Sequence, residues 1–315
     1  MKRLRVLILA NHGKPGVTAA LRKIRRWLDE CTQVVAEPMI RQLTATAAEQ
    51  LPEADLGLVF GGDGTMLQQA RLFAGRRLPL LGINFGKLGF LAEFTVDELV
   101  GYWPRIAAGK IPLSDRMMFR VLVRRADGSL GKAITDDNLI AMNEAVLVSG
   151  SPHRMMDMEL GIRPPQGAST VVGFRGDGAI VATPTGSTAY NLGAGGPIVH
   201  PALDAFCFTP TCTNSLNFRP VIVGADHTVS LTIKRAQAPA SLVLDGQVSL
   251  DLHKGDTVEA QRATTSLRLI CHPYATYWQM LSRKMHWIAR PRSHWSPVHS
   301  TTDSCQNKQG SGSCT

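Results

Sequence analysis

Several patterns are missing from this sequence of 315 residues. No apolar run approaches the length that spans a bilayer as a helix, and the run at residues 6–10 is too short for a secretory signal. The six cysteines form no Cys-x-x-Cys pair, and no cluster of histidine and cysteine has zinc spacing. We therefore expect a cytoplasmic protein with reduced thiols, no metal-ligating residues and no membrane contact.

The common phosphate-binding and nucleic-acid-binding patterns are missing as well. The stretch from Gly82 to Lys87 has the wrong spacing for a P-loop and lacks the hydroxyl residue after the lysine. The net charge is +9, and no acidic residue precedes Asp29. This basic N-terminal part is either a solvated helix face or a source of attraction for polyanionic ligands. No basic stripe with aromatics and no DNA-binding motif accompanies it, so we expect no nucleic-acid partner.

Strand and helix patterns alternate over residues 1–110. This order predicts an α/β N-terminal doubly wound domain with a mostly parallel sheet. The predicted strands are 6–10, 32–36, 56–60 and 78–83, and the predicted helices are 17–30, 44–50, 66–74 and 96–108. Such sheets bind ligands at the carboxyl ends of their strands, where the loops 11–13, 61–65 and 84–86 fall. We expect these three loops to face one crevice.

The pattern changes after Pro112. Short β-rich segments separated by turn residues fill residues 111–276 and predict an all-β, sandwich-like C-terminal domain. The predicted strands are 117–125, 139–148, 155–162, 170–174, 179–182, 220–223, 229–234, 241–244, 257–261 and 266–271. Residues 277–289 predict a helix that packs back on the first domain, and residues 290–315 predict a disordered tail.

The turn Gly61-Gly62-Asp63-Gly64-Thr65 links a predicted strand to the helix that follows it. Its bare amides and the helix N-terminus favour an anion that approaches closely. A carboxylate in such a cradle is unfavourable unless a metal or a proton transfer uses it, so Asp63 indicates phosphoryl transfer. The alternative is a tight strand-to-helix turn in which Asp63 caps the helix.

A second run of small residues extends from residue 173 to residue 197. Asp177 again stands between glycines, and a short apolar strand then leads to a loop that carries Ser187, Thr188 and Tyr190. The hydroxyls offer donors and acceptors without bulk, and the tyrosine offers a ring for a flat base or a sugar. This run predicts a ligand-binding loop, and the alternative is a surface loop with the tyrosine in the core.

Two polar features interrupt the β-rich region. Asn143 and Glu144 lie inside a predicted strand, where buried polar side chains need partners. They are either a structural hydrogen-bonded pair or part of a polar pocket. Asp245-Gly246-Gln247 has the composition of a hairpin turn, and taken alone it is predicted to be one.

The sequence resembles the NAD kinase family from about Val6 to about Trp287. The resemblance rests on residues 61–65, on Asn143-Glu144 and, most specifically, on Asp177-Gly178 followed by residues 183–198. The first motif is shared with diacylglycerol and sphingosine kinases and, as a close variant, with phosphofructokinases. The hydroxyl–glycine loop resembles NAD kinases only. The sequence departs from the family at Gly193, where a serine is common, and over residues 207–218.

The resemblance implies transfer of the γ-phosphate of ATP to the 2′-hydroxyl of the adenosine ribose of NAD, giving NADP, with Asp63 as the general base. It also implies phosphate contacts by Gly61, Gly62, Gly64 and Thr65. The implied NAD-binding residues, where the two domains meet, are Asp63, Gly64, Asn143, Glu144, Arg154, Arg175, Asp177, Thr188, Ala189, Tyr190, Asn191, Leu192, Gly193 and Gln247.

The sequence contains no cluster of carboxylates that would form a metal cage, so we expect Mg²⁺ to arrive with ATP and to be mostly water-coordinated. A flat face of the β domain would suit a homo-oligomer, either a dimer or a tetramer. Two other functions stay open. One is a lipid kinase that shares the glycine turn, although no membrane-binding helix is evident. The other is a catalytically idle module that binds NAD or nucleic acid, against which the presence of Asp63 argues.

Overall fold

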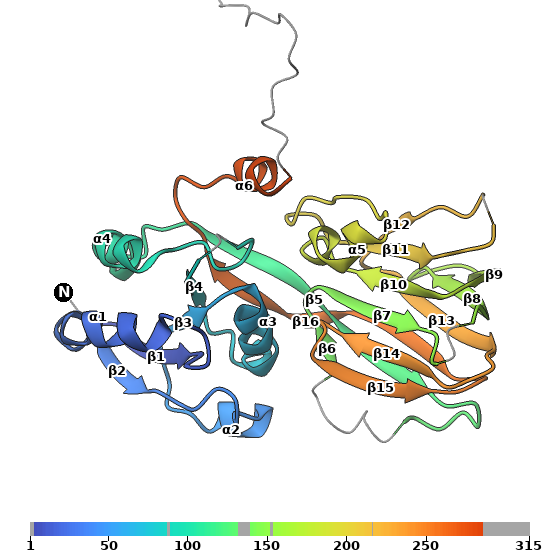
Figure 1. The fold of residues 1–315 in the computed structure, drawn as a ribbon, viewed down its shortest axis with the longest axis horizontal. Helices are drawn as coiled ribbons and strands as arrows, with labels where there is room; N and C mark the ends of the chain where they lie inside the picture. The colour runs from blue at the N-terminus through green and yellow to red at the C-terminus, as the bar shows by residue number, and fades with distance from the viewer. Residues whose placement is uncertain (1–2, 87–88, 132–138, 152–153, 216, 286–315) are drawn as a thin grey trace, which may run out of the picture. The chain divides into compact units, whose positions relative to one another are not determined.

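The computed structural model describes residues 3–86, 89–131, 139–151, 154–215 and 217–285. The chain divides into two units, Met1–Tyr277 and the part that begins at Trp278. Figure 1 shows the first unit. In the described part of the chain, no helix has the length and apolar character needed to cross a membrane. The predicted tail, residues 290–315, lies outside the described residues.

The first part of the chain forms a parallel sheet with helices on both faces (Figure 1). The strands are β1 (Arg5–Ala10), β2 (Gln33–Ala36), β3 (Leu56–Gly61) and β4 (Leu80–Asn84), in the order β2-β1-β3-β4. The helices are α1 (Val17–Cys31), α2 (Ala45–Glu49), α3 (Asp63–Leu72), η1 (Ala74–Arg76) and α4 (Val96–Ala107). Successive residues of β1 alternate in direction: Val6 and Ile8 pack with α1 and α4, whereas Leu7 and Leu9 pack with α2 and α3. The predicted doubly wound arrangement is therefore confirmed.

The same sheet continues into the β-rich part of the chain. Strand β16 (Thr257–Ile270) pairs in parallel with β4 through Leu269 and Leu80, and antiparallel with the long strand β5 (Leu113–Arg124). The order of the sheet among the described residues is β2-β1-β3-β4-β16-β13-β8-β9, with β5 joined to β16 and β6. The further strands are β6 (Ile140–Ala141), β8 (Met156–Arg163), β9 (Thr170–Gly176) and β13 (Thr228–Arg235).

A second, antiparallel sheet packs face to face with the β-rich half of the first. Its order is β12-β11-β10-β7-β14-β15. Its strands are β7 (Glu144–Val148), β10 (Gly178–Ala182), β11 (Ala205–Thr211), β12 (Val221–Gly224), β14 (Ala240–Leu244) and β15 (Val248–Leu252). Aromatic rings meet between the sheets, with 5.7 Å between the centroids of Phe119 and Phe206 and 5.7 Å between those of Phe174 and Phe208. The predicted sandwich-like region is confirmed.

The elements differ from the prediction in five places. The predicted strand 139–148 is divided into β6 and β7, and the two predicted strands 257–261 and 266–271 are one strand whose register shifts between Arg262 and Ser266. Strands β11 and β15 are not predicted. Helix α3 begins at Asp63 rather than at Met66. The C-terminal helix is α6 (Tyr277–Lys284), and its packing, like the domain division near residue 110, stays a prediction.

Candidate active site

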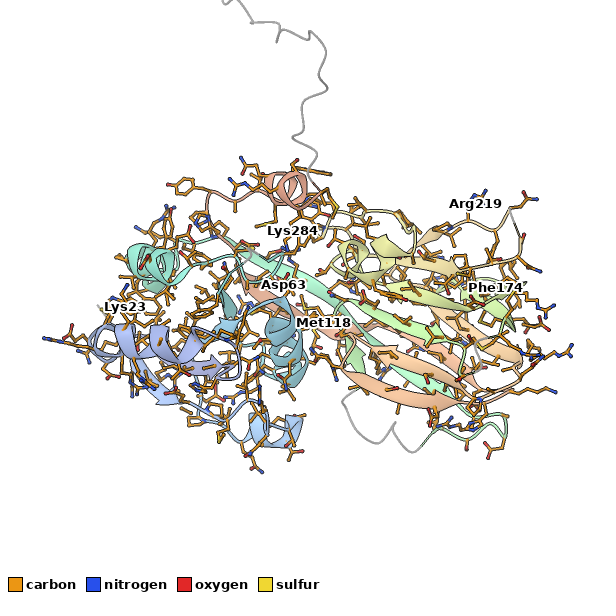
Figure 2. The ribbon with its side chains drawn as sticks, viewed as in Figure 1. Lys23, Asp63, Met118, Phe174, Arg219 and Lys284 are labelled. Carbon is orange, nitrogen blue, oxygen red and sulfur yellow. The ribbon has the colours of Figure 1, made fainter. Side chains whose placement is uncertain are left out.

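Asp63 is the first residue of α3, directly after β3 and the two glycines (Figure 2). Its carboxylate accepts three backbone hydrogen bonds from the loop that follows β4. Oδ2 accepts from the amide of Phe90 at 2.9 Å, and Oδ1 accepts from the amides of Leu91 and Ala92, both at 3.1 Å. The N-cap of the helix is Gly62, which has no capping side chain. The alternative of Asp63 as a helix cap is therefore wrong, because its carboxylate serves a different loop.

The carboxylate of Asp63 keeps one acceptor position open. Each carboxylate oxygen can accept two hydrogen bonds, and the amides occupy both positions on Oδ1 but one on Oδ2. The side chain is half-buried, so a ligand can reach it. Gly89 lies so close that a Cβ atom at this position would overlap Oδ1. The loop approaches the carboxylate this closely only because residue 89 has no side chain.

Lys14 and Asn11, in the loop after β1, also reach the glycine turn. Lys14 Nζ donates to the carbonyl oxygen of Gly61 at 3.1 Å, and a Cβ at Gly62 would lie 2.7 Å from that nitrogen. Asn11 Nδ2 donates to Thr65 Oγ1 at 3.3 Å. This loop is predicted to lie at the strand ends, but Lys14 is not among the predicted site residues. A cation directly after a predicted strand-end loop is the signal that would have indicated it.

Asp245 holds the polar segment that divides the predicted strand 139–148. Its carboxylate accepts from the amides of Met142 at 2.9 Å, Asn143 at 2.8 Å and Glu144 at 3.1 Å. Asp245 has a positive φ of 49° and is 7% exposed. The hairpin turn 245–247 is thus a structural clamp as well as a turn. It explains why β7 begins at Glu144 instead of continuing from β6.

Asn143 and Glu144 are buried polar side chains with unused atoms. They are 9% and 6% exposed, and Asn143 Oδ1 and Glu144 Oε2 have no hydrogen-bond partner among the described residues. The pKa of Glu144 is raised to about 8: burial is the largest cause, the nearby charge of Asp245 adds to the shift, and the amide of Tyr190 opposes it. Burial also raises the pKa of Asp245 itself. Of the two alternatives for this pair, unpartnered buried acceptors favour a pocket that a ligand completes.

Gln247 connects the two turns that contain aspartates, the glycine turn 61–65 and the hairpin turn 245–247. Its Nε2 donates to the carbonyl oxygen of Gly64 at 2.9 Å, and Arg71 Nη1 donates to its Oε1 at 3.2 Å. Burial lowers the pKa of Arg71, and the charge of Asp245 opposes that shift. The structure therefore brings Asp63, Gly64, Asn143, Glu144 and Gln247 into one connected cluster, although they come from both regions of the chain.

The hydroxyl–glycine loop is rigidly tied to this cluster. Thr183 Oγ1 donates to the carbonyl oxygen of Met142 at 2.6 Å, and a Cβ at Gly186 would overlap the backbone of Asn143. The loop continues through η3 (Gly186–Thr188) and α5 (Tyr190–Gly193). Tyr190 is 57% exposed, which rules out the alternative of a core tyrosine. Thr188, Ala189 and Leu192 are half-buried and Gly193 is exposed, so all four can meet a ligand.

Asn191 differs from the other predicted residues of this loop. It is fully buried, Thr209 Oγ1 donates to its Oδ1 at 2.7 Å, and its Nδ2 donates to the carbonyl oxygens of Ser187 and Pro197. All its polar atoms therefore hold the loop in shape. The side chain of Asn191 therefore has no free polar atom for a ligand in this conformation.

Three predicted NAD-binding residues lie away from the cluster. Asp177 precedes β10, whose other end reaches the hydroxyl–glycine loop, because Gly178 pairs with Val148 and Ala182 with Glu144. Five residues of strand separate the two ends, roughly 17 Å at ~3.3 Å per residue. Arg175 is exposed on β9 and pairs with Asp157 at 3.4 Å, and Arg154 is exposed before β8. Within one chain, these three side chains do not join Asp63.

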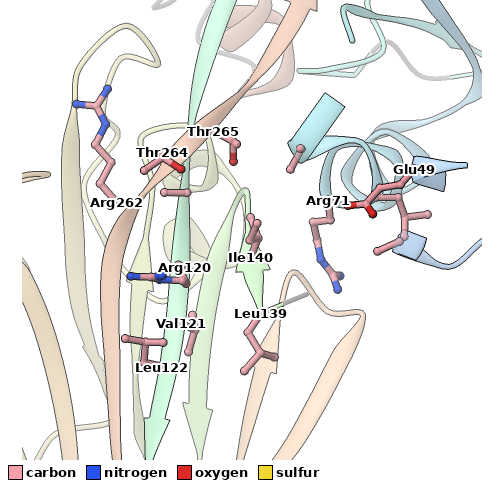
Figure 3. Close-up of a pocket in the computed structure, with 15 residues that line it drawn as sticks. Glu49, Arg71, Arg120, Val121, Leu122, Leu139, Ile140, Arg262, Thr264 and Thr265 are labelled. Atoms are coloured by element: carbon pink, nitrogen blue, oxygen red, sulfur yellow. The ribbon is translucent and has the colours of Figure 1, made fainter. Parts of the chain in front are cut away.

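A cavity of about 390 Å³ lies beside the C-terminal half of α3, between this helix and strands β5, β6 and β16 (Figure 3). Its lining includes Arg71, Leu139 and Ile140, and it includes neither Asp63 nor Glu144. Figure 3 shows Arg120 and Arg262 extending away from Arg71. The cavity therefore borders the cluster through Arg71 and is not the crevice at the strand ends.

Two family models match the sequence. Residues 6–111 match the model described as the ATP-NAD kinase N-terminal domain, and residues 142–271 match the ATP-NAD kinase C-terminal domain. The NAD kinase of Syntrophotalea carbinolica is 36% identical over 92% of this chain and 100% of its own length. The NAD kinase of Trichlorobacter lovleyi is 33% identical over 90% of this chain and 99% of its own length.

Two solved structures have the same fold. The yeast NADH kinase complexed with NADH has a TM-score of 0.77 and 21% identity, with coverage of 93% of this chain and 90% of that one. The NAD kinase from Archaeoglobus fulgidus in complex with ATP has a TM-score of 0.67 and 21% identity, with coverage of 89% and 99%. At this identity the likeness concerns the fold.

Proposed function

The chain belongs to the ATP-NAD kinase family and is an NAD kinase, and we propose that Asp63 is its general base. In this reaction the γ-phosphate of ATP passes to the 2′-hydroxyl of the adenosine ribose of NAD, so that NADP forms and ADP leaves. The observation that supports Asp63 most directly is its carboxylate, which three amides hold and which keeps one position of Oδ2 open.

A sugar hydroxyl is a weak nucleophile, so the transfer needs a positioned proton acceptor and an electrophile whose charge is masked. A positioned base contributes typically ~10²–10⁴ in rate. The three amides fix the carboxylate without covering its open position, so it can accept the hydroxyl proton while the oxygen attacks phosphorus. Positioning and charge stabilisation account for the rest of the acceleration.

Phosphate binding falls to the glycine turn and to Lys14. We assign the amides of Gly61, Gly62, Gly64 and Thr65 to the transferred phosphate, because they stand at the N-terminus of α3. Lys14 Nζ donates one hydrogen bond to Gly61, and an ammonium group has three hydrogens. The two remaining hydrogens can bind phosphate oxygens beside the turn.

A divalent metal fits this site only as an ion that the nucleotide carries. Among the described residues no group of three or more His, Cys, Asp or Glu side chains could hold a metal. Mg²⁺ is often bound through substrate phosphates, waters and one or two carboxylates, and Asp63 is the carboxylate nearest the glycine turn. When bound, the ion would mask the charge of the phosphates.

We assign the dinucleotide to the pocket completed by Asn143 and Glu144, next to the loop 188–193 and to Gln247. Arg154, Arg175 and Asp177 lie at the far end of β10 or beyond it. They would contact NAD if a second copy of the chain brought its own β10 end to this pocket. We therefore propose a homo-oligomer, a dimer or a tetramer, in which each NAD meets two chains.

The function is tested by incubating the purified protein with ATP, Mg²⁺ and NAD and measuring NADP. Asp63→Asn should lower kcat by ~10²–10⁴, while calorimetry shows NAD binding within a few-fold of the original. If Asp63→Asn retained turnover, Asp63 would not be the general base. The crossed assay of NAD and NADH with several phosphoryl donors gives the specificity. Phosphorylation of lipid vesicles in its place would favour the lipid kinase, and NAD binding without turnover would favour the idle module.

A further inference from the structure

The loop that holds Asp63 is itself anchored by the next residue along the chain. Glu93 directly follows Phe90, Leu91 and Ala92, whose amides bind the Asp63 carboxylate. Glu93 is 8% exposed, and its Oε2 accepts the backbone amide of His272 at 2.7 Å. His272 follows the end of β16, so this bond ties the loop after β4 to a segment far along the sequence.

Aromatic contacts join the same two segments on either side of Glu93. The rings of Phe90 and Tyr277 lie 6.3 Å apart, and the rings of Phe94 and His272 lie 5.2 Å apart. The loop 90–94 therefore meets the segment 272–277 at its first residue, at its last residue and at the carboxylate between them. The hydrogen bond from the His272 amide to the Glu93 carboxylate adds a directional contact to this packing.

The charge of Glu93 is balanced only in part. The pKa of Glu93 is raised to about 7: burial is the largest cause and the charge of Asp63 adds to it, whereas the His272 amide and the charge of Arg116 oppose the shift. Arg116 is 8% exposed, and its Nε has no hydrogen-bond partner among the described residues. A buried and incompletely balanced charge is weak evidence for a gain in stability, which favours a role for Glu93 in fixing the position of the loop.

We propose that Glu93 is a positioning residue for phosphoryl transfer. It fastens the amide loop to His272, and the loop in turn sets the direction of the open Oδ2 position of Asp63. This inference rests on the proposed role of Asp63. Glu93 itself touches neither the hydroxyl nor the phosphate in this scheme. A reacting group displaced by about 1 Å loses on the order of 10²-fold in rate, so a loose loop would lower turnover without weakening substrate binding.

The test compares Glu93→Ala with two matched variants. In Glu93→Ala, kcat should fall ~10–100-fold, while the KM values for NAD and ATP stay within about threefold. Glu93→Gln keeps an oxygen that accepts from His272 and should restore most of kcat. Glu259→Ala removes an equally buried carboxylate, 7% exposed and paired with Arg124 at 3.0 Å on the distant half of β16. It should lower stability and leave kcat unchanged.

Amide hydrogen exchange provides a readout that needs no turnover. Protection of residues 90–92 should be lost in Glu93→Ala and kept in Glu259→Ala. If Glu93→Ala does not fold, Glu93→Asp withdraws the carboxylate from His272 and should give the same change in kcat and exchange. An unchanged kcat, or a loss of activity that follows stability equally in both alanine variants, would overturn the proposal. If the original protein forms no NADP, the proposed role of Asp63 fails, and the exchange measurement still decides whether Glu93 anchors the loop 90–92.

Discussion

Asp63 and Asp245 are held in the same way in two different parts of the fold. Each carboxylate accepts the amides of three consecutive residues from a separate segment, 90–92 for Asp63 and 142–144 for Asp245. The surroundings differ. Asp63 is half-buried at the start of a helix, and Asp245 is 7% exposed in a left-handed turn conformation beside Glu144.

The difference shows how one hydrogen-bonding device can serve chemistry or shape. An amide triad on an accessible carboxylate orients it and leaves it free to react. The same triad on a buried carboxylate satisfies three backbone donors that would otherwise be orphaned, and so fixes the backbone of Asn143 and Glu144. Gln247 connects the two, since it follows Asp245 by two residues and bonds to the residue after Asp63.

The largest expected effect separates the two aspartates by stability. Asp245→Ala leaves three buried amides without an acceptor, at ~1–3 kcal/mol for each unsatisfied group, so the free energy of unfolding should fall by at least ~3 kcal/mol. Asp63→Asn should change it by less than ~1 kcal/mol, because water can reach the half-buried site. Urea unfolding of both variants measures the contrast. Equal decreases in the free energy of unfolding would mean that the amide triads of Asp63 and Asp245 stabilise the fold equally.

The second expected effect is a pH dependence of stability that comes from Glu144, the buried carboxyl beside Asp245. The pKa of Glu144 is about 8 in the folded protein, against an ordinary 4.5. Because the pKa is raised in the folded protein, the contribution of Glu144 to the free energy of unfolding is fully present below pH 4.5. It is lost as the pH rises through 8. At ~1.4 kcal/mol per pKa unit, the loss amounts to a few kcal/mol.

Glu144→Gln should remove this part of the pH dependence. The measurement is urea unfolding of the original protein and of the variant between pH 4 and 9, and the difference between the two curves isolates Glu144. Parallel curves over that range would contradict the buried, uncompensated state of this carboxyl. Glu159→Gln is the matched control with little expected change, because Glu159 is a half-buried acid on β8 that pairs with Lys234 at 3.2 Å.

The third expected effect concerns the phosphate side of Asp63. Lys14→Met removes the ammonium group from the glycine turn, and a charge-assisted hydrogen bond is worth ~1.5–3 kcal/mol, so the KM for ATP should rise at least ~10-fold. The KM for NAD should change little. Lys23→Met, on the exposed face of α1 (Figure 2), is the control for net charge and should leave both values unchanged. A similar rise in both lysine variants would indicate a general field instead of a local contact.

The parts of the fold that the sequence predicts are those with local periodicity. The continuous apolar runs of β1 and β3, the apolar faces of α1 and α4 and the glycine turn all involve neighbours within a few residues. The sequence of β15 alternates apolar and polar residues, so this strand was predictable from its local pattern. Strand β11 contains Pro210, which argues against a strand. The structure accommodates it because the pairing of β12 covers only residues 205–208, so no neighbour on that side requires the amide of residue 210.

The remaining features depend on contacts between distant residues. Nothing near Leu269 in the sequence indicates that β16 pairs with β4 and carries one sheet through both regions. The partners of Asp63 lie 27–29 residues away and those of Asp245 lie 101–103 residues away. A carboxylate between glycines indicates a special turn, but only the tertiary structure shows which amides it meets. The role of Glu93 cannot be predicted from the sequence for the same reason, because its partner His272 is 179 residues away.

The smallest expected effect tests the bridge between the two aspartate turns. Gln247→Ala removes the donor to Gly64 and the acceptor for Arg71, both at an exposed site, so kcat/KM for ATP should fall about fivefold, equivalent to ~1 kcal/mol. Gln247→Glu keeps the acceptor for Arg71 but places a negative charge against the Gly64 carbonyl and the phosphates. It should therefore be worse than alanine, although its pairing with Arg71 is stronger. If the glutamate variant matched the original protein in kcat/KM, the contact with Arg71 would be the one that matters, and the two turns would work independently.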